Sequence, residues 1–264
     1  MCDVSHFQRW PWPRILAHRG AGTLAPENTL AALRVGRSLG FRGVEFDAMA
    51  PLDDVPVLMH DPTLERTTGV DGAVTARRAE ELAHLDAGAW HSAAYAQERV
   101  PTLVQALRYC QDELIWPNVE IKPAPGHEAR TGDLVARVVA DVYADALHPE
   151  GGRASMLDAR LPLLSSFAEE AIAAARAAVP GVPRALLIDR VPEDWPARLR
   201  QVDAVSLNTN HKHLMEATAR SIKQAGYWLF CYTVNDPQRA RQLLAWGVDA
   251  FCTDRIDLIG PDFA

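Results

Sequence analysis

The chain has 264 residues, of which 48% are hydrophobic and 23% charged, enough to bury the core of one α/β barrel or of two small domains. Its 27 basic and 34 acidic side chains give a formal net charge of −7, which excludes the electrostatic footprint of a protein that binds nucleic acid or an anionic membrane surface. Because no run of about 18 uncharged apolar residues occurs, a transmembrane helix is also excluded.

The amino-terminal segment, residues 1–13, has neither the apolar core nor the cleavage site of a secretory signal. Its Trp10-Pro11-Trp12 run is expected to close the bottom of a barrel rather than to anchor the chain in lipid, because no basic amphipathic helix accompanies it. The cysteines are widely spaced, form no Cys-x-x-Cys pair and are expected to be reduced. We therefore predict a cytoplasmic protein with no nucleic-acid partner and no stable membrane insertion.

Short apolar runs then alternate with stretches of helical spacing along the chain. The expected strands cover residues 14–17, 44–47, 119–122, 163–167, 184–188, 204–207, 227–234 and 250–253. The expected helices cover residues 28–39, 128–147, 169–178, 195–201, 214–225 and 237–246. Near-continuous apolar runs are typical of parallel strands buried on both faces. This pattern predicts an α/β fold, a (β/α)₈ TIM barrel, as a single domain over residues 1–264.

One segment, residues 48–101, breaks the alternation and is predicted to be a small inserted subdomain after the second strand. It contains an extra strand at residues 55–59, which returns beside the second strand through Asp53 and Asp54. An open doubly wound sheet is the structural alternative. It is disfavoured because the stretch from His18 to Gly22 lacks the third glycine of a dinucleotide-binding loop.

Charged side chains follow the ends of several expected strands. Side chains two apart on a strand point the same way, so Glu45 projects with Asp47, and Glu120 with Lys122. In a TIM barrel the carboxyl-terminal ends of the strands carry the catalytic residues. We therefore expect these groups to converge with two histidine motifs, which are His18-Arg19-Gly20 and His60-Asp61.

The three carboxylates, of Glu45, Asp47 and Glu120, suit a hard divalent cation, Mg²⁺ or Ca²⁺, better than Zn²⁺. Arg19 and Lys122 are expected to neutralise the charge that builds on a phosphoryl group.

His18 and His60 are the expected acid and base, because an unperturbed imidazole titrates near neutral pH. The sequence does not say which ring takes which role.

Each motif also has a purely structural interpretation. His60-Asp61 could cap a loop, Glu120 and Lys122 could form a salt bridge across the rim, and Glu45 with Asp47 could lie exposed at a strand end. Glu27 and Asn28 read as a helix start, with Asn28 as the N-cap, and a direct contact with the site is the less favoured interpretation of this pair.

The ordered set of motifs resembles the glycerophosphodiester phosphodiesterase family over nearly the whole chain. The motifs are His18-Arg19-Gly20, Pro26-Glu27-Asn28-Thr29, Glu45-Phe46-Asp47, His60-Asp61, Glu120-Ile121-Lys122, Tyr232-Thr233-Val234-Asn235, Gly247-Val248-Asp249 and Thr253-Asp254. The resemblance implies a TIM-barrel enzyme that uses a divalent cation, Mg²⁺ or Ca²⁺. Such an enzyme hydrolyses glycerophosphodiesters to sn-glycerol 3-phosphate and an alcohol.

Two positions depart from the family pattern. Tyr232 stands where the family commonly has Trp, which affects an aromatic wall over the substrate, and Asp54 stands where it commonly has Gly in a turn. Two alternative functions stay open: a barrel phospholipase acting on phosphoinositide or sphingomyelin headgroups, and a non-catalytic barrel that binds a phosphoester. The headgroup preference and the oligomeric state are not predicted.

Overall fold

The protein is described here from a computed structural model, which covers residues 9–148 and 158–264. Eight parallel strands form a closed barrel, because the first strand pairs with both the second and the last. These strands are β1 (Ile15–Ala17), β2 (Gly43–Met49), β4 (Trp116–Ile121), β5 (Leu163–Ser166), β6 (Arg184–Ile188), β7 (Ser206–Asn210), β8 (Trp228–Tyr232) and β9 (Ala250–Thr253). The predicted TIM barrel is confirmed.

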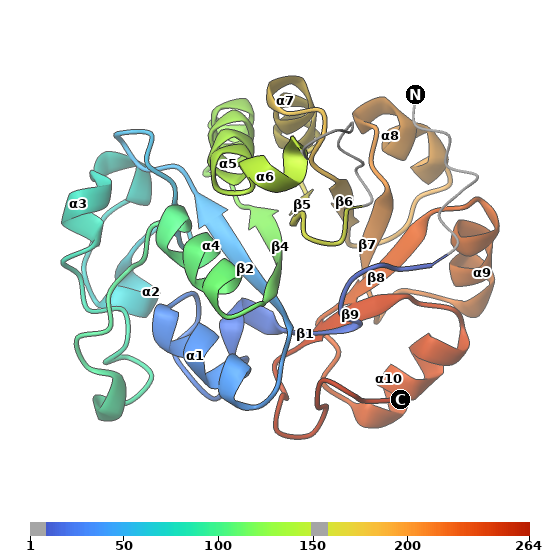
Figure 1. The fold of residues 1–264 in the computed structure, drawn as a ribbon, viewed down its shortest axis with the longest axis horizontal. Coiled ribbons are helices and arrows are strands. Elements are labelled where there is room, and N and C mark those ends of the chain that lie inside the picture. Colours follow the sequence, from blue (N-terminus) through green and yellow to red (C-terminus); the bar gives the residue numbers. More distant parts are fainter. Residues whose placement is uncertain (1–8, 149–157) are drawn as a thin grey trace.

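Helices surround the strands, as Figure 1 shows. The longer ones are α1 (Leu30–Ser38), α4 (Leu103–Asp112), α5 (Glu128–Val142), α7 (Glu169–Ala178), α8 (Trp195–Val202), α9 (Glu216–Gln224) and α10 (Pro237–Ala245). The single helix expected over residues 128–147 is interrupted at Tyr143, after which α6 (Ala144–Leu147) begins. The sequence analysis did not name α4, which provides the helical return between β2 and β4.

Aromatic side chains close the amino-terminal end of the barrel. The rings of Trp12 and Trp116 stack with centroids 4.8 Å apart, and Trp228 lies 5.0 Å from Trp12. Trp10 packs edge-on against Trp12 at 4.8 Å. Because Trp116 and Trp228 are the first residues of β4 and β8, this cluster marks the bottom of the barrel. The expected role of Trp10 and Trp12 is confirmed.

The segment between β2 and α4 adds structure beside the barrel mouth. Its strand β3 (Val57–Leu58) pairs antiparallel with the end of β2, and the short helices α2 (Glu65–Thr68) and α3 (Ala79–Leu82) follow. Asp54 adopts a φ of 63°, the left-handed conformation that the turn requires and that Gly adopts more freely. The grouping of residues 48–101 as a subdomain stays a prediction.

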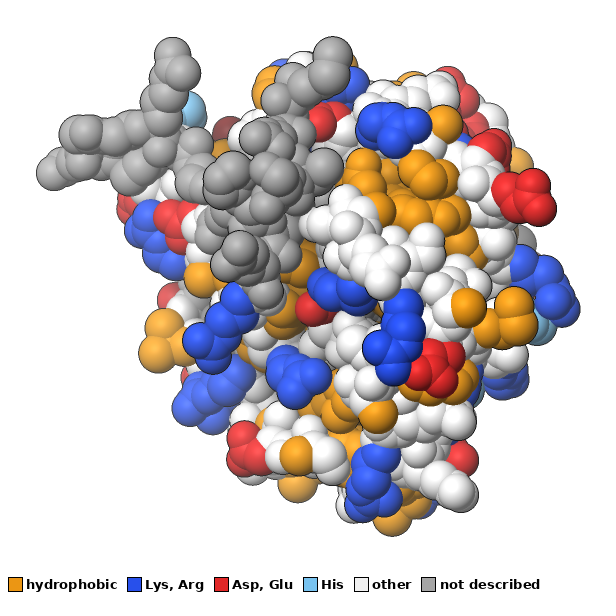
Figure 2. Space-filling model, turned by 90° about the vertical axis from the view of Figure 1, so that its right-hand side faces the viewer, with side chains coloured by type: hydrophobic (Ala, Val, Ile, Leu, Met, Phe, Trp, Pro, Cys, Tyr) orange, Lys and Arg blue, Asp and Glu red, His pale blue; other side chains and the backbone are white. Residues whose placement is uncertain are grey.

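None of the helices in the described part of the chain combines the length and apolar character needed to cross a bilayer. The face drawn in Figure 2 carries separate apolar patches among Lys, Arg, Asp and Glu side chains. On this face, apolar side chains are therefore interspersed with charged ones.

Candidate active site

A cavity of about 300 Å³ lies at the carboxyl-terminal end of the barrel strands. It is lined by His18, Arg19, Glu45, His60, Asn118, Glu120, Lys122, Ser165, Phe167, Leu187, Phe230, Tyr232, Thr233 and Cys252. A second cavity, of about 410 Å³, lies among α4, α5, α6 and the start of β4, and within the described part of the chain its charged lining residues are Asp145 and Arg160. The first cavity is therefore the candidate active site, because the charged and titratable groups gather there.

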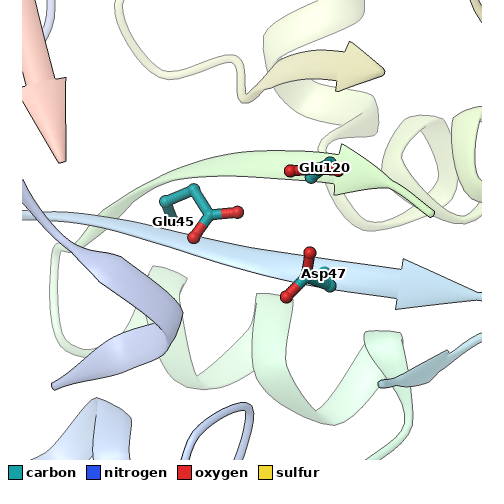
Figure 3. Close-up of side chains that lie close together, drawn as sticks. All are labelled: Glu45, Asp47 and Glu120. Carbon is teal, nitrogen blue, oxygen red and sulfur yellow. The ribbon is translucent and has the colours of Figure 1, made fainter. Parts of the chain in front are cut away.

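Three carboxylates meet beneath this cavity. One oxygen each from Glu45, Asp47 and Glu120 lies within 4.8 Å of the other two. Figure 3 shows Glu45 and Asp47 on β2 with Glu120 on the neighbouring strand β4. The parallel register of the two strands pairs Asp47 with Glu120, which brings their side chains to the same level of the barrel.

Burial makes this cluster costly to ionise. Burial and then repulsion from Asp47 raise the pKa of Glu45 to about 7 and that of Glu120 to about 8. Burial acts on Asp47 in the same direction, but the charges of Arg19 and Lys122 outweigh it and lower the pKa of Asp47. A set of closely spaced carboxylate oxygens fits a hard divalent cation such as Mg²⁺ or Ca²⁺.

Arg19 is held over the cluster by an unusual backbone conformation. Its φ is 50°, in the left-handed region that non-glycine residues rarely adopt. Its backbone N–H donates to Glu45 Oε2 at 3.1 Å, and its Nη1 donates to Glu27 Oε1 at 2.7 Å. Its Nε lies 3.4 Å from Asp47 Oδ2. The guanidinium therefore faces the carboxylates at the cavity wall.

Lys122 supplies the second cation. Its Nζ donates to Glu120 Oε1 at 2.7 Å and lies 3.7 Å from Asp47 Oδ1. The salt bridge between Glu120 and Lys122 that the sequence allowed is therefore present. It lies in the cavity wall rather than across an exposed rim, because the side chain of Glu120 is 12% exposed.

Asn28 contacts the site, which was the less favoured of its two interpretations from the sequence. The prediction that it caps the following helix is wrong, because the Thr29 side chain accepts the N-cap hydrogen bond from Ala32. Asn28 instead donates from Nδ2 to Asp47 Oδ2 at 2.9 Å and accepts the backbone N–H of Asp47 at 3.1 Å. Its φ of 58° lies in the left-handed region, whereas Thr29 has the extended backbone usual for an N-cap. Asn28 thus fixes the position of Asp47.

The two histidines enter the cavity from different elements. His18 begins the 3₁₀ turn η2 (His18–Gly20) directly after β1, and its Nε2 lies 3.7 Å from Glu45 Oε2. His60 follows β3 and lines the same cavity.

Their pKa values are shifted in opposite directions. Burial would lower the pKa of His18, but its hydrogen bond to Asp254 and the charge of Glu45 outweigh burial and raise it. Burial lowers the pKa of His60, and the nearby cations reinforce that effect against the attraction of Asp47.

Tyr232 and Phe167 form an aromatic wall on the other side. Their ring centroids are 5.6 Å apart in an edge-to-face arrangement, and Lys122 Nζ lies 5.6 Å from the Phe167 centroid. The Tyr232 hydroxyl is buried and has no hydrogen-bond partner among the described residues. Phe167 was not selected from the sequence, although it is the last residue of the fourth predicted strand.

The model of the glycerophosphoryl diester phosphodiesterase family matches residues 18–258. The chain belongs to this family. The family resemblance read from the motifs is thereby confirmed, and with it the prediction of a phosphodiester hydrolase.

Three similar proteins match this chain along almost their whole length. The glycerophosphodiester phosphodiesterase of Caldanaerobacter subterraneus is 29% identical over 245 residues, covering 91% of this chain and 93% of that protein. A phosphodiesterase of Oleispira antarctica, solved in complex with the product sn-glycerol-3-phosphate, is 33% identical with a TM-score of 0.81. That match covers 92% of this chain and 93% of the other. The glycerophosphodiester phosphodiesterase of Agrobacterium tumefaciens is 25% identical with a TM-score of 0.71, covering 93% and 98% of the two chains.

Proposed function

We propose that this protein hydrolyses glycerophosphodiesters to sn-glycerol 3-phosphate and an alcohol, with a divalent cation bound by Glu45, Asp47 and Glu120. The observation that carries the proposal is the convergence of these carboxylates with two histidines at one cavity. When bound, the cation would supply Lewis-acid polarisation of a phosphate oxygen.

Two side chains are available to bind the phosphodiester. Arg19 presents a planar guanidinium at the cavity wall, and Lys122, directly after β4, presents an ammonium group. Both are paired with carboxylates and held in place before a substrate arrives, which favours stabilisation of charge that develops during the reaction. We expect them to contact the nonbridging phosphate oxygens.

Hydrolysis requires two proton transfers, and two imidazoles line the cavity. One histidine of the pair His18 and His60 accepts the proton of the attacking nucleophile. The other donates a proton to the alkoxide that leaves when the phosphorus–oxygen bond breaks. Each transfer contributes roughly 10²–10⁴ in rate. Tyr232 and Phe167 are expected to form the wall against a carbon-rich part of the substrate.

Family membership supports glycerophosphodiesters over phosphoinositide or sphingomyelin headgroups. A purely binding role is disfavoured, because binding alone needs no pair of imidazoles beside three carboxylates. A cytoplasmic location stays a prediction of the sequence, as does the expectation that the substrate is a small molecule and not a nucleic acid.

The test follows glycerophosphocholine by ³¹P NMR, with Mg²⁺, with Ca²⁺ and with excess EDTA. We expect glycerol 3-phosphate to form with a cation and not with EDTA. Phosphocholine as the product would indicate the phospholipase alternative, and no turnover of any glycerophosphodiester would contradict the proposal. Glu45→Gln is expected to raise the Mg²⁺ concentration required, whereas Glu113→Gln, at a half-exposed position after α4, serves as the matched control.

A further inference from the structure

We propose that Asp254 and Asp61 are positioning residues that hold the Nδ1 proton of His18 and His60, so that Nε2 of each ring is the nitrogen that transfers a proton. This inference rests on the proposed function and deepens it. Neither aspartate was assigned a role in the reaction from the sequence.

The first pair joins the residues that follow the first and the last strand of the barrel, β1 and β9. His18 Nδ1 lies 2.5 Å from Asp254 Oδ1, a residue 236 positions away in the chain. An ionised carboxylate has no proton to give, so the bond requires the proton on Nδ1. The opposite ring nitrogen, Nε2, lies on the side of the carboxylate cluster, 3.7 Å from Glu45 Oε2. In the neutral ring this nitrogen is therefore the one with a free lone pair.

Asp254 is fixed by contacts that leave one oxygen for the histidine. Its Oδ2 accepts a hydrogen bond from Asn235 Nδ2 at 2.9 Å, and its backbone N–H donates to Asn235 Oδ1 at 2.8 Å. Its carbonyl accepts the backbone N–H of Thr23 at 3.0 Å. At Gly22 a Cβ atom would stand 2.1 Å from that carbonyl oxygen, so only glycine permits the close approach. The loop that carries His18 is thus docked on Asp254 itself.

The second pair is held by a chain of ion pairs. His60 Nδ1 lies 2.5 Å from Asp61 Oδ1, and Asp61 Oδ2 accepts Arg66 Nε at 2.5 Å. Arg66 also donates through both terminal nitrogens to Glu27, at 2.7 Å each. Glu27 in turn binds Arg19 at 2.7 Å. The chain links the ring of His60 to the guanidinium that faces the carboxylate cluster.

Helix capping does not account for either aspartate. The N-cap of α2 is Leu64, which has no side-chain cap bond, so Asp61 does not cap that helix. The turn after β9 is bridged by Thr253, whose hydroxyl accepts the backbone N–H of Arg255.

Both carboxylates, of Asp61 and Asp254, are anionic at neutral pH. The bond from Arg66 is the main cause that lowers the pKa of Asp61 to about 2. For Asp254, burial acts upward, but the bonds from His18 and Asn235 prevail and lower the pKa.

The kinetic test uses Asp254→Asn and Asp61→Asn at saturating Mg²⁺ with glycerophosphocholine as substrate. An amide can donate to Nδ1 and so favours the tautomer with the proton on Nε2. We expect kcat to fall at least about a hundredfold with KM changed by less than about threefold. Asp257→Asn, at an exposed position in the same turn, and Asp71→Asn, in the segment that carries Asp61, are the matched controls.

The spectroscopic test reads the tautomers directly. Long-range ¹H–¹⁵N spectra of histidine-labelled wild type, assigned with His18→Gln and His60→Gln, are recorded at a pH where both rings are neutral. We expect the proton on Nδ1 in both rings, and on Nε2 of the affected ring in each Asn variant. A wild-type ring with its proton on Nε2 would overturn the inference for that pair, as would unchanged kcat in the folded Asn variant.

The two tests separate this inference from the proposed function. Absence of wild-type turnover would sink the proposed function, whereas the wild-type tautomers test the two hydrogen bonds without any turnover. If an Asn variant does not fold, as judged by circular dichroism, the wild-type tautomers decide the inference.

Discussion

Cation binding should compete with protons at Glu45 and Glu120, and the size of the effect follows from their pKa values. These values are about 7 for Glu45 and about 8 for Glu120, raised chiefly by burial. A protonated carboxyl group is a poor ligand, so a bound cation must displace whatever protons the two groups carry. The raised values place this competition between pH 6 and pH 9. The affinity of the site for the cation should therefore rise with pH and level off above the pKa of Glu120.

The magnitude can be worked out for two pH values. At pH 7 roughly half of the Glu45 groups and nine-tenths of the Glu120 groups are protonated, so each cation releases about 1.4 protons. At pH 9 both groups are almost fully ionised. The apparent Kd for Mg²⁺ should therefore fall about twentyfold from pH 7 to pH 9, which corresponds to about 2 kcal/mol.

Titration calorimetry in two buffers of different ionisation enthalpy measures both quantities. Glu120→Gln should bind Mg²⁺ more weakly and release only about 0.5 proton at pH 7, because Glu45 alone still titrates. A Kd that does not change between pH 7 and pH 9, with no proton release, would refute the assignment of these carboxylates as ligands.

Further predictions concern the cavity and the barrel bottom. His18→Ala and His60→Ala should each lower kcat by at least about a hundredfold, and Mg²⁺ titration calorimetry should show binding retained; full activity in either variant would remove that ring from the mechanism. Lys122→Met should lower kcat/KM by at least about tenfold, because a cation at the phosphate is lost; an unchanged value would place the phosphate elsewhere. Tyr232→Phe should leave the melting temperature unchanged, because the Tyr232 hydroxyl has no hydrogen-bond partner among the described residues. It should raise KM about threefold or more, because the hydroxyl is expected to contact the substrate. A markedly lower melting temperature would contradict this account. Trp12→Ala should lower the free energy of unfolding, measured by urea titration, by about 3–5 kcal/mol while the folded enzyme keeps its kcat; a stable variant would exclude the aromatic plug as a structural element.

The barrel and most of the site could be predicted because each depends on local patterns. Apolar runs identified all eight barrel strands, and the two-residue period of a strand predicted that Glu45 and Asp47 share a face. Helix ends were less certain, because the capping group depends on a single side chain. Thr29, and not its neighbour Asn28, accepts the N-cap hydrogen bond. Nothing in the local sequence shows that Asn28 instead binds Asp47, which lies on another element.

Contacts between distant segments follow from the register of the closed sheet. β1 pairs with β9 so that Ala17 lies opposite Thr253. The residues that directly follow these two strands are His18 and Asp254, and His18 Nδ1 lies 2.5 Å from Asp254 Oδ1. The same argument applies where β2 pairs with β4, because Asp47 opposite Glu120 brings two of the proposed ligands to one level. A shift of either pairing by one residue would turn the partner side chains to the opposite face. The register between β1 and β9 is thus what makes Asp254, the last acidic residue of the motif set, a neighbour of the first histidine.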